Sequence, residues 1–446
     1  MKEKVSMNVV NPKAAGIDIG SRSHFVSIGQ NAKDVREFGV YSPDHQDLIE
    51  WLMNVGIQTV AMESTGNYWQ RLFSALQLAG FEVLLVNGRQ IKNVKGKTDV
   101  KDCQWIQKLH SLGLLSGSFL PSTEIEKMRN YERHRSWMVE QCAKMSNKMQ
   151  KALRLMNIRL DIAISDITGK TGMAIIKAII DGERSGEKLS MLADPRVRKS
   201  KQEIAKALQG QWDAGLLFEL KDCYELYCDY QQRIMESDLQ VEQLLKSLPK
   251  RDGGSKSIQR AKTSKRPHKN QHRINIHEYS FQYLGVDLFA IEGVKQQTIM
   301  SFLSEVGMDI VRFKTAKNFV SWLRLAPNNK ISGGKTLSSR TPKGKNKMAI
   351  ALRNAANTIG LMKKGVLKRF FDRIAYKKGR AAAVTATARK LAVIIWNMVI
   401  KQQQFQPIDE TSYNEWIRKN VIDNINNKMR RMNLSINDLA LSKIKS

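Results

Sequence analysis

Short apolar runs separated by turns dominate the first part of the chain. Residues 14–20 and 24–29 are two such runs joined by the turn SRS, and this order predicts a β-hairpin. The runs TVAM (59–62) and EVLLV (82–86) predict two further buried strands, and the segment 68–79 between them repeats its apolar residues at helical spacing. A hairpin followed by alternating strands and helices predicts an α/β domain with a mixed sheet.

The period changes in the middle of the chain, where two seams repeat at steps of three and four residues, the heptad spacing of coiled coils. The first seam is Met138, Cys142, Met145, Met149, Ala152 and Met156; the second is Leu220, Tyr224, Tyr227, Gln231, Ile234, Asp238, Val241, Leu245 and Leu248. Gln231 and Asp238 are polar interruptions. We expect two long helices, with a small helical insert at 162–208, that form a coiled-coil hairpin or a dimer-forming arm. Two amphipathic helices in a globular bundle are the alternative.

A basic segment follows the second seam. Residues 250–273 carry nine Lys and Arg against one Asp, which predicts a linker that is unfolded in isolation. Its composition suits contact with a phosphate backbone, and a solvated tether is the alternative. The predicted organisation is an α/β domain at 1–122, a helical arm at 123–249, a basic linker at 250–280, a mainly helical domain at 281–404 and a helical tail at 405–446.

Composition narrows the choice of partners. The 446 residues include 73 Lys+Arg and 42 Asp+Glu, a formal net charge of +31, and 42% are hydrophobic. Such a chain is not disordered, and its charge predicts a polyanionic partner: DNA, RNA or an anionic membrane. The longest apolar stretch, 391–400, is about half of a spanning helix, and the first residues contain no signal-peptide core. We therefore expect a cytoplasmic protein without a membrane partner, with its four cysteines reduced.

Four acidic residues form the first candidate site. Asp18 lies between apolar residues in GIDIG, where a buried carboxylate is costly unless it binds something positive. Glu63 follows TVAM directly, and Asp99 and Asp102 lie three apart at a predicted helix start, on one helix face. If they converge, their oxygens suit Mg²⁺ or Mn²⁺ and phosphoryl transfer. Taken singly, Asp99 is equally explained as a helix-start acid and Glu63 as the partner of a basic residue.

A loop at 323–340 forms the second candidate site. Ser332 precedes two glycines, which allow a tight turn and expose the serine hydroxyl, and Lys335 would neutralise an attacked phosphate. No histidine lies near this stretch of sequence, so an acyl-transfer triad is not expected, and a nucleophilic serine needs another activator, such as a metal held by the acids. The alternative is a DNA-binding turn without a covalent role, and Ser338 and Ser339 are competing serines.

Basic residues near both candidates are expected to contact nucleic-acid phosphates. They are Arg89, Lys97 and Lys101 beside the acids, and Lys335, Arg340, Lys343 and Lys345 after Ser332. A third segment, 291–304, predicts a helix that begins after the turn at Gly293, with only one glycine of a helix-hairpin-helix phosphate-binding turn. The aromatic residues around it fit a core better than a base-stacking platform.

Six segments of the sequence occur in an order that resembles one family. They are GIDIG, AMEST, GKTDVKD, DITGKTGMAIIKAI, the stretch from IEGV to SEVG, and the stretch from RLAPNNKISGGK to RTPKGKNKMAIALRNAAN. Over roughly residues 12–400 the chain resembles the DEDD-type insertion-sequence transposases related to Piv-like DNA invertases, the RNA-guided "bridge" recombinases. It departs from the family pattern at IEGVK, where many relatives have a PGIG-like hairpin, and at Cys103, where an alanine is common.

The resemblance implies an N-terminal RuvC-like (RNase H-like) domain, a coiled-coil region and a C-terminal transposase domain. It implies that Asp18, Glu63, Asp99 and Asp102 bind the metal, and that Ser332 attacks a DNA phosphate to form a phosphoserine link. It also implies a tetramer in which these two sites come from different protomers. A structured guide RNA would pair with element-end and target DNA in a bacterial cytoplasm, near the nucleoid.

Two other functions remain open at the level of sequence. A RuvC-like nuclease or junction resolvase would cleave DNA with water and would not need Ser332. A non-catalytic nucleic-acid-binding protein would need neither Ser332 nor the acids.

Overall fold

The computed structural model describes residues 8–91, 98–251, 269–344, 346–406 and 410–434. The chain divides into two compact units, Met1–Leu120 and Pro121–Ser446, and each is described by itself.

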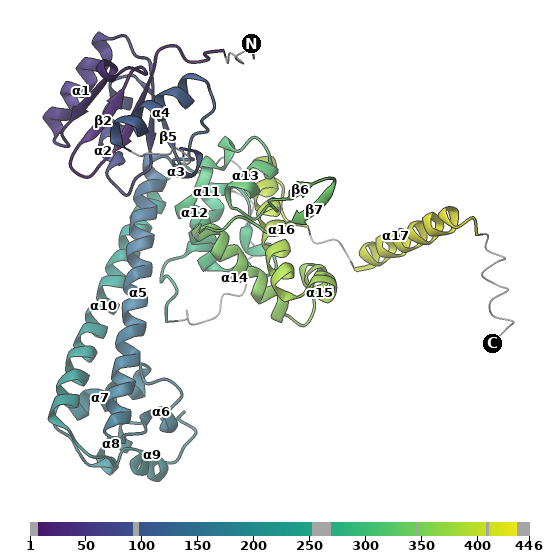
Figure 1. Ribbon diagram of the computed structural model, residues 1–446. Helices are drawn as coiled ribbons and strands as arrows, with labels where there is room; N and C mark the ends of the chain where they lie inside the picture. Colours follow the sequence, from purple (N-terminus) through teal and green to yellow (C-terminus); the bar gives the residue numbers. More distant parts are fainter. Residues whose placement is uncertain (1–7, 92–97, 252–268, 345, 407–409, 435–446) are drawn as a thin grey trace. The chain divides into compact units, whose positions relative to one another are not determined.

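The first unit is built on a five-stranded mixed sheet (Figure 1). The strands are β1 (Ala14–Ile19), β2 (His24–Ser27), β3 (Val35–Phe38), β4 (Thr59–Glu63) and β5 (Glu82–Val86). They lie in the order β3-β2-β1-β4-β5, with β1, β2 and β3 antiparallel and β1, β4 and β5 parallel. This is an RNase H-like sheet, and the predicted hairpin and mixed sheet are confirmed.

Helices cover both faces of the sheet. Ile17 and Met62 belong to a core cluster under α1 (Ser42–Asn54) and α2 (Trp69–Leu78). Ala61 and Val86 belong to a smaller cluster with Ile106 on the other face, under α3 (Gly88–Ile91) and α4 (Asp99–Ser111). Because neighbouring residues of a strand face opposite sides, the acids of β1 and β4 can be assigned to one of these faces.

The second unit contains a pair of long helices, α5 (Thr123–Leu155) and α10 (Ala214–Ser247), which run side by side in Figure 1. The predicted heptad seams bury Met138, Met149, Leu220, Tyr227 and Val241 between them. Each such side chain contributes about 1.5–3 kcal/mol when it is buried. The predicted coiled-coil hairpin is therefore formed within one chain. The predicted insert consists of four short helices: α6 (Leu160–Ala163), α7 (Lys170–Ile180), α8 (Gly186–Met191) and α9 (Lys201–Ala207).

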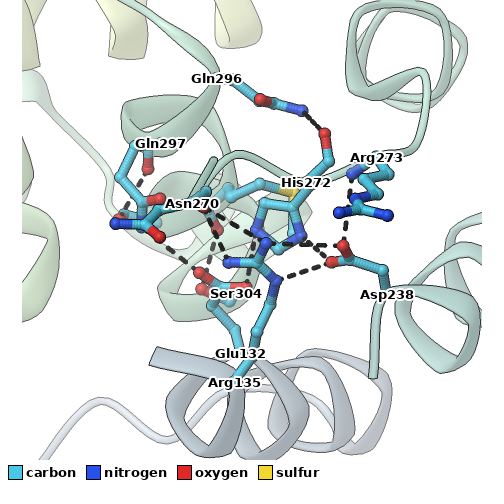
Figure 2. Close-up of polar contacts among 11 residues, drawn as sticks. Glu132, Arg135, Asp238, Asn270, His272, Arg273, Gln296, Gln297 and Ser304 are labelled. Carbon is cyan, nitrogen blue, oxygen red and sulfur yellow. Dashed lines mark hydrogen bonds and ion pairs between the residues drawn. The ribbon is translucent and has the colours of Figure 1, made fainter. Parts of the chain in front are cut away.

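Asp238, which looked like an interruption of the seam, is the centre of a buried ionic network (Figure 2). The Nε of Arg135, a residue only 2% exposed, donates to Asp238 Oδ1 at 2.6 Å. His272 Nδ1 lies 2.7 Å from the same oxygen, and Arg135 also donates to the carbonyl of Asn270. The polar residue therefore pairs with an arginine on the facing helix instead of weakening the contact.

The end of the segment 250–273 contributes to this network. This segment was predicted to be unfolded in isolation, whereas in the folded chain its residue His272 is buried. His272 is 2% exposed, and its carbonyl accepts a hydrogen bond from Gln296. Residues 252–268 lie outside the described residues. The linker domain was predicted to extend to residue 280, whereas α11 already begins at Ile276. The charge of this segment predicted that it would be solvated, whereas Asp238, an acidic residue on α10, binds it through His272.

A helical domain follows this segment in the same unit. Its helices are α11 (Ile276–Leu284), α12 (Gln296–Glu305), α13 (Ala316–Trp322), α14 (Lys347–Leu361), α15 (Val366–Lys378) and α16 (Arg380–Lys401). Short 3₁₀ turns lie in this domain at η2 (Leu288–Ala290) and η3 (Gly307–Arg312), and in the first unit at η1 (Ala32–Asp34). Phe302 and Phe319 are fully buried, and the ring of Phe313 contacts those of Phe319 and Trp322. The prediction that these aromatic residues form a core is confirmed. A further helix, α17 (Glu410–Arg431), ends the described chain.

The apolar stretch at 391–400 is part of a longer helix than predicted. The whole of α16 is long and apolar enough to span a membrane by length and composition. Leu391, Ala392, Ile395 and Val399 on one face of it are buried, and it packs against α13, α14 and α15. A helix that packs in the core of a domain can have this same length and apolar composition, so the packing of α16 accounts for its apolar residues.

Candidate active site

Two of the predicted acids end neighbouring parallel strands. Ile17 of β1 pairs with Met62 of β4, so Asp18 and Glu63 each lie one residue further along. Ile17 and Met62 face the core under α1 and α2. The half-buried Asp18 and Glu63 therefore face the opposite side of the sheet, which α4 covers.

The N-terminus of α4 brings the other two acids to this same side. The helix begins at Asp99, as predicted, and Asp99 and Asp102 both lie in its first turn. Thr98 caps the helix by accepting a hydrogen bond from the Lys101 backbone amide at 3.3 Å. The positive end of the helix dipole favours carboxylates here, which explains why two acids are tolerated so close together.

Gly16 lets α4 lie directly on β1. A Cβ at this position would lie 2.2 Å from the backbone nitrogen of Gln107 and 2.5 Å from the carbonyl oxygen of Cys103. Any side chain would push the helix away from the strand, and with it the acids of its first turn. The sequence reasoning did not assign this role to Gly16, because close contact between a strand and a distant helix leaves no local pattern.

Cys103 reports the electrostatic character of the site. Burial is the largest cause that raises the pKa of its thiol to about 12, and the negative charges of Asp18 and Asp102 contribute to the same rise. These two carboxylates therefore lie near enough to Cys103 to act on it from β1 and from α4. The thiol stays protonated at neutral pH and serves as a small packing residue.

Gly88 borders the site on the side of Glu63. A Cβ at residue 88 would lie 2.2 Å from Glu63 Oε1, so a larger residue there would force this carboxylate to move from its position. Glu63 pairs with Val86 across the β4–β5 ladder, and Gly88 follows two residues later, at the start of α3. Gly88 was not among the predicted site residues; its position just after a strand on the same side as the acids was the available signal.

The donor set of these four acids suits a hard divalent cation. Carboxylate oxygens are the ligands that Mg²⁺ and Mn²⁺ prefer. Within the described ranges, no group of three or more His, Cys, Asp or Glu is close enough to hold a metal ion. The oxygen chemistry of the donors fits the cation, although the described side chains share one side of the sheet without forming a closed set of ligands.

The second candidate residue, Ser332, lies on a β-hairpin. It ends β6 (Lys330–Ser332) and pairs with Lys335, the first residue of β7 (Lys335–Ser338). Gly333 and Gly334 have φ angles of 53° and 73°, the left-handed region that a two-residue type I′ turn requires at both positions. The predicted tight turn is confirmed, although strands flank it where a loop was expected. Ser332 is exposed, and space is open beside both glycines.

Hydrogen bonds close the base of this hairpin. The Asn328 amide donates to the Arg340 carbonyl at 3.1 Å, and the Arg324 guanidinium donates to the Lys343 carbonyl at 2.6 Å. The side chains of Lys335, Arg340 and Lys343 are exposed, as is that of Lys101 in the first unit. Lys97, Lys345 and the side chain of Arg89 lie outside the described residues.

The acids and Ser332 thus belong to different compact units. Two family models match the chain: one covers most of the first unit and the beginning of the second, and the other lies within the second unit. A model of the DEDD transposase domain of IS110 elements matches residues 15–158, which include all four acids. A model described as "Transposase IS116/IS110/IS902 family" matches residues 287–372, which include Ser332. Together they cover just over half of the chain. A search of the curated proteins found no match.

Proposed function

The chain belongs to the IS110 family of transposases, and from this premise we propose that it is an RNA-guided recombinase that acts through a phosphoserine intermediate. Its DEDD domain implies a DNA transposase that binds DNA and uses a divalent metal. The nucleophile, the ligands and the guide are proposals, and so are action in the bacterial cytoplasm and assembly into a dimer or tetramer.

Asp18, Glu63, Asp99 and Asp102 would hold Mg²⁺ or Mn²⁺. Support comes from their shared side of the sheet and from the two glycines, Gly16 and Gly88, whose missing side chains make room there. A bound divalent cation supplies neutralisation of negative charge at a phosphate. The capped first turn of α4 places Asp99 and Asp102 three residues apart at the N-terminus of this helix, where the helix dipole favours carboxylates.

Ser332 would be the nucleophile, and the observation that carries this proposal is its exposure at the end of a two-glycine hairpin. No side chain at Gly333 or Gly334 hinders the approach of a DNA backbone. The Ser332 oxygen would form a bond to phosphorus as it loses its proton, and the bond to a deoxyribose oxygen would break, with that oxygen taking a proton. The phosphodiester energy is kept in the new ester, so a second strand can be joined by the reverse step.

The net charge of +31 supports contact with two nucleic acids, a guide RNA and a DNA duplex. Base pairing by the guide would choose the sequence, while the protein contacts backbones through exposed basic residues such as Lys335 and Arg340. This division of labour agrees with the exposed cations Lys330 and Lys335 on the two strands of the hairpin.

The test uses full-length protein expressed together with its native flanking DNA, so that any structured RNA copurifies. Element-end DNA and Mg²⁺ are added, and the covalent protein–DNA adduct is mapped by mass spectrometry. We expect an adduct at Ser332 that Ser332→Ala and Asp18→Ala abolish, and that Ser338→Ala and Ser339→Ala retain. Cleavage that persists in Ser332→Ala without an adduct would instead indicate a nuclease that uses water. Recovery of only heterogeneous, salt-removable RNA would contradict guidance by RNA.

A further inference from the structure

A pocket opens beside the base of the Ser332 hairpin, within the second unit. It has a volume of about 780 Å³, in the range of sites for small molecules. Pro327 and Arg340 line it from the hairpin base, Lys378 from the end of α15, and Arg389 from α16. We call it the hairpin-base pocket.

The inner wall of the hairpin-base pocket is apolar because α16 presents small side chains to it. Ala382, Ala386 and Val393 lie on one face of this helix, and the ring of Phe370 from α15 lies beside them. Alanines at these positions leave a hollow where larger residues would fill the groove between α15 and α16. The wall can therefore contact a flat apolar group.

The rim of the pocket is cationic. Arg340, Lys378, Arg389 and Lys390 line it, and no acidic residue is among its lining residues in the part of the chain that the structure describes. The Lys390 ammonium lies 4.4 Å from the centre of the Phe370 ring, so a cation faces the apolar wall directly. Burial lowers the pKa of Lys390, and the charge of Arg373 lowers it further, so an anion bound nearby would relieve this cost.

We propose that the hairpin-base pocket receives one unpaired nucleotide of the DNA strand that Ser332 attacks. A nucleotide combines what the pocket offers, a flat apolar base for the alanine wall and flanking phosphates for the cationic rim. This inference rests on the proposed function of Ser332, and it adds a specific subsite for the substrate next to the nucleophile.

The position of the pocket along the hairpin supports this choice. Arg340 pairs with Asn328 at the hairpin base, and Ser332 lies four residues further along β6. At about 3.3 Å per residue, the two points are about 13 Å apart along the strand. A DNA strand with one phosphate at Ser332 would therefore bring a nearby nucleotide of the same strand to Arg340. A base that remains paired and stacked in a duplex cannot enter the pocket, so the nucleotide must be extruded.

The experiment places 2-aminopurine at successive positions on each side of the scissile phosphate in an element-end duplex. This base fluoresces more strongly when it leaves the stack. With the full-length protein and its copurified RNA, we expect a several-fold rise at one DNA position. Ala386→Phe, which fills the hairpin-base pocket, should abolish the rise. A half-buried alanine of α15 outside the lining, Ala375, provides the matched control Ala375→Phe, and melting curves verify that both variants fold.

A second pair of variants tests the rim without changing packing. Lys378→Gln should weaken binding of the labelled duplex severalfold and lower the slope of affinity against salt by about one counterion. Its exposed neighbour Lys377 does not line the pocket, and Lys377→Gln removes the same charge. This control variant should therefore keep the fluorescence rise of the wild type. Equal losses in both variants would overturn the proposal.

The outcomes separate this inference from the proposed function. An adduct at Ser332 without a fluorescence rise at any DNA position would overturn the pocket assignment and leave the nucleophile intact. A rise that Ala386→Phe removes, in a protein that forms no adduct, would support the pocket and contradict the role of Ser332. A rise from 2-aminopurine in the guide RNA but not in the DNA would also overturn the proposal.

Discussion

The helical arm and the hairpin-base pocket treat charge in opposite ways. Within the arm, Arg135 is buried against Asp238, and Arg133 of α5 forms a bidentate pair with Glu305 of α12, with Nε donating at 3.1 Å and Nη2 at 2.9 Å. At the pocket, four cations gather without an acid among the lining residues that the structure describes. Charges that are matched inside the chain hold its elements together, whereas charges that converge without a counter-ion are available to a ligand.

The difference is also one of cost. The arm network removes Arg135 and His272 from water, and their contacts with Asp238 across α5, α10 and the 269–273 segment offset this cost (Figure 2). Three of the pocket cations, Arg340, Lys378 and Arg389, are exposed, so water and salt weaken their mutual repulsion. Removing a charge should therefore harm stability in the first region and binding in the second.

The largest expected effect on stability is in the arm. Arg135→Ala leaves the Asp238 carboxylate buried without its arginine, which should lower the free energy of unfolding by about 3–5 kcal/mol. Chemical unfolding followed by circular dichroism measures this loss. The control is Arg154→Ala, which removes an exposed ion pair with Asp161 and should cost less than about 1 kcal/mol.

A double variant sharpens the same prediction. Arg135→Met with Asp238→Leu removes both charges and fills the space with apolar atoms, so it should recover most of the lost stability. If the double variant is as unstable as Arg135→Ala, the lost stability comes from packing and not from the unpaired charge. That result would contradict the view that charge stabilises the arm but serves binding at the pocket.

A smaller effect is expected from pH. Burial alone would lower the pKa of His272, but its contacts with Asp238 and with Glu132, whose Oε2 lies 3.0 Å from the ring nitrogen, raise it above the ordinary value. A group whose folded pKa is raised stabilises the protein most below its unfolded pKa, about 6.5, and this contribution is lost as pH rises through the folded pKa. Stability of the arm should therefore fall as pH rises above neutrality.

The measurement is chemical unfolding across that pH range, with His272→Gln as the comparison. The variant should be less stable at acidic pH and should lose the part of the pH dependence that His272 causes. A wild-type profile that rises with pH in this window, or one that His272→Gln leaves unchanged, would show that the imidazole stays neutral in the network.

The smallest effect on stability should come from the pocket. Arg340→Gln removes an exposed cation, so the free energy of unfolding should change by no more than about 0.5 kcal/mol. Affinity for DNA should fall uniformly across sequences, with a salt slope lower by about one. Unfolding and binding measured on the same preparation test this; a large loss of stability would mean that Arg340 is structural, like Arg135.

Elements defined by short-range periodicity were predictable from the sequence. The runs TVAM and EVLLV became β4 and β5, and the heptad steps became α5 and α10. Two elements were not among those expected. The strand β3 (VREF) is short and half-exposed and has little apolar character, so it gave no signal. The helix α1 did give one, because its apolar residues, among them Leu48 and Trp51, recur at helical spacing.

What could not be predicted depends on residues that are distant in sequence. Gly16 and Gly88 matter only because α4 and Glu63 lie against them, and a glycine does not reveal its neighbour. Asp238 was recognised as a break in the seam, but its meaning depends on Arg135, about a hundred residues earlier. The same is true of His272, which local charge placed in a solvated linker and which the network buries.

The length of the two arm helices sets how far the insert lies from the other end of the arm. A helix of 34 residues such as α10 extends for about 51 Å, so the four small helices of the insert are carried on a stiff rod. A change of seven residues in both helices would lengthen the rod by about 10.5 Å and keep the insert facing the same direction. A change of three or four residues would rotate it by about 50° in one direction or the other relative to the seam. Relatives with longer or shorter arms would therefore be expected to differ in whole heptads, so that reach varies while orientation is preserved.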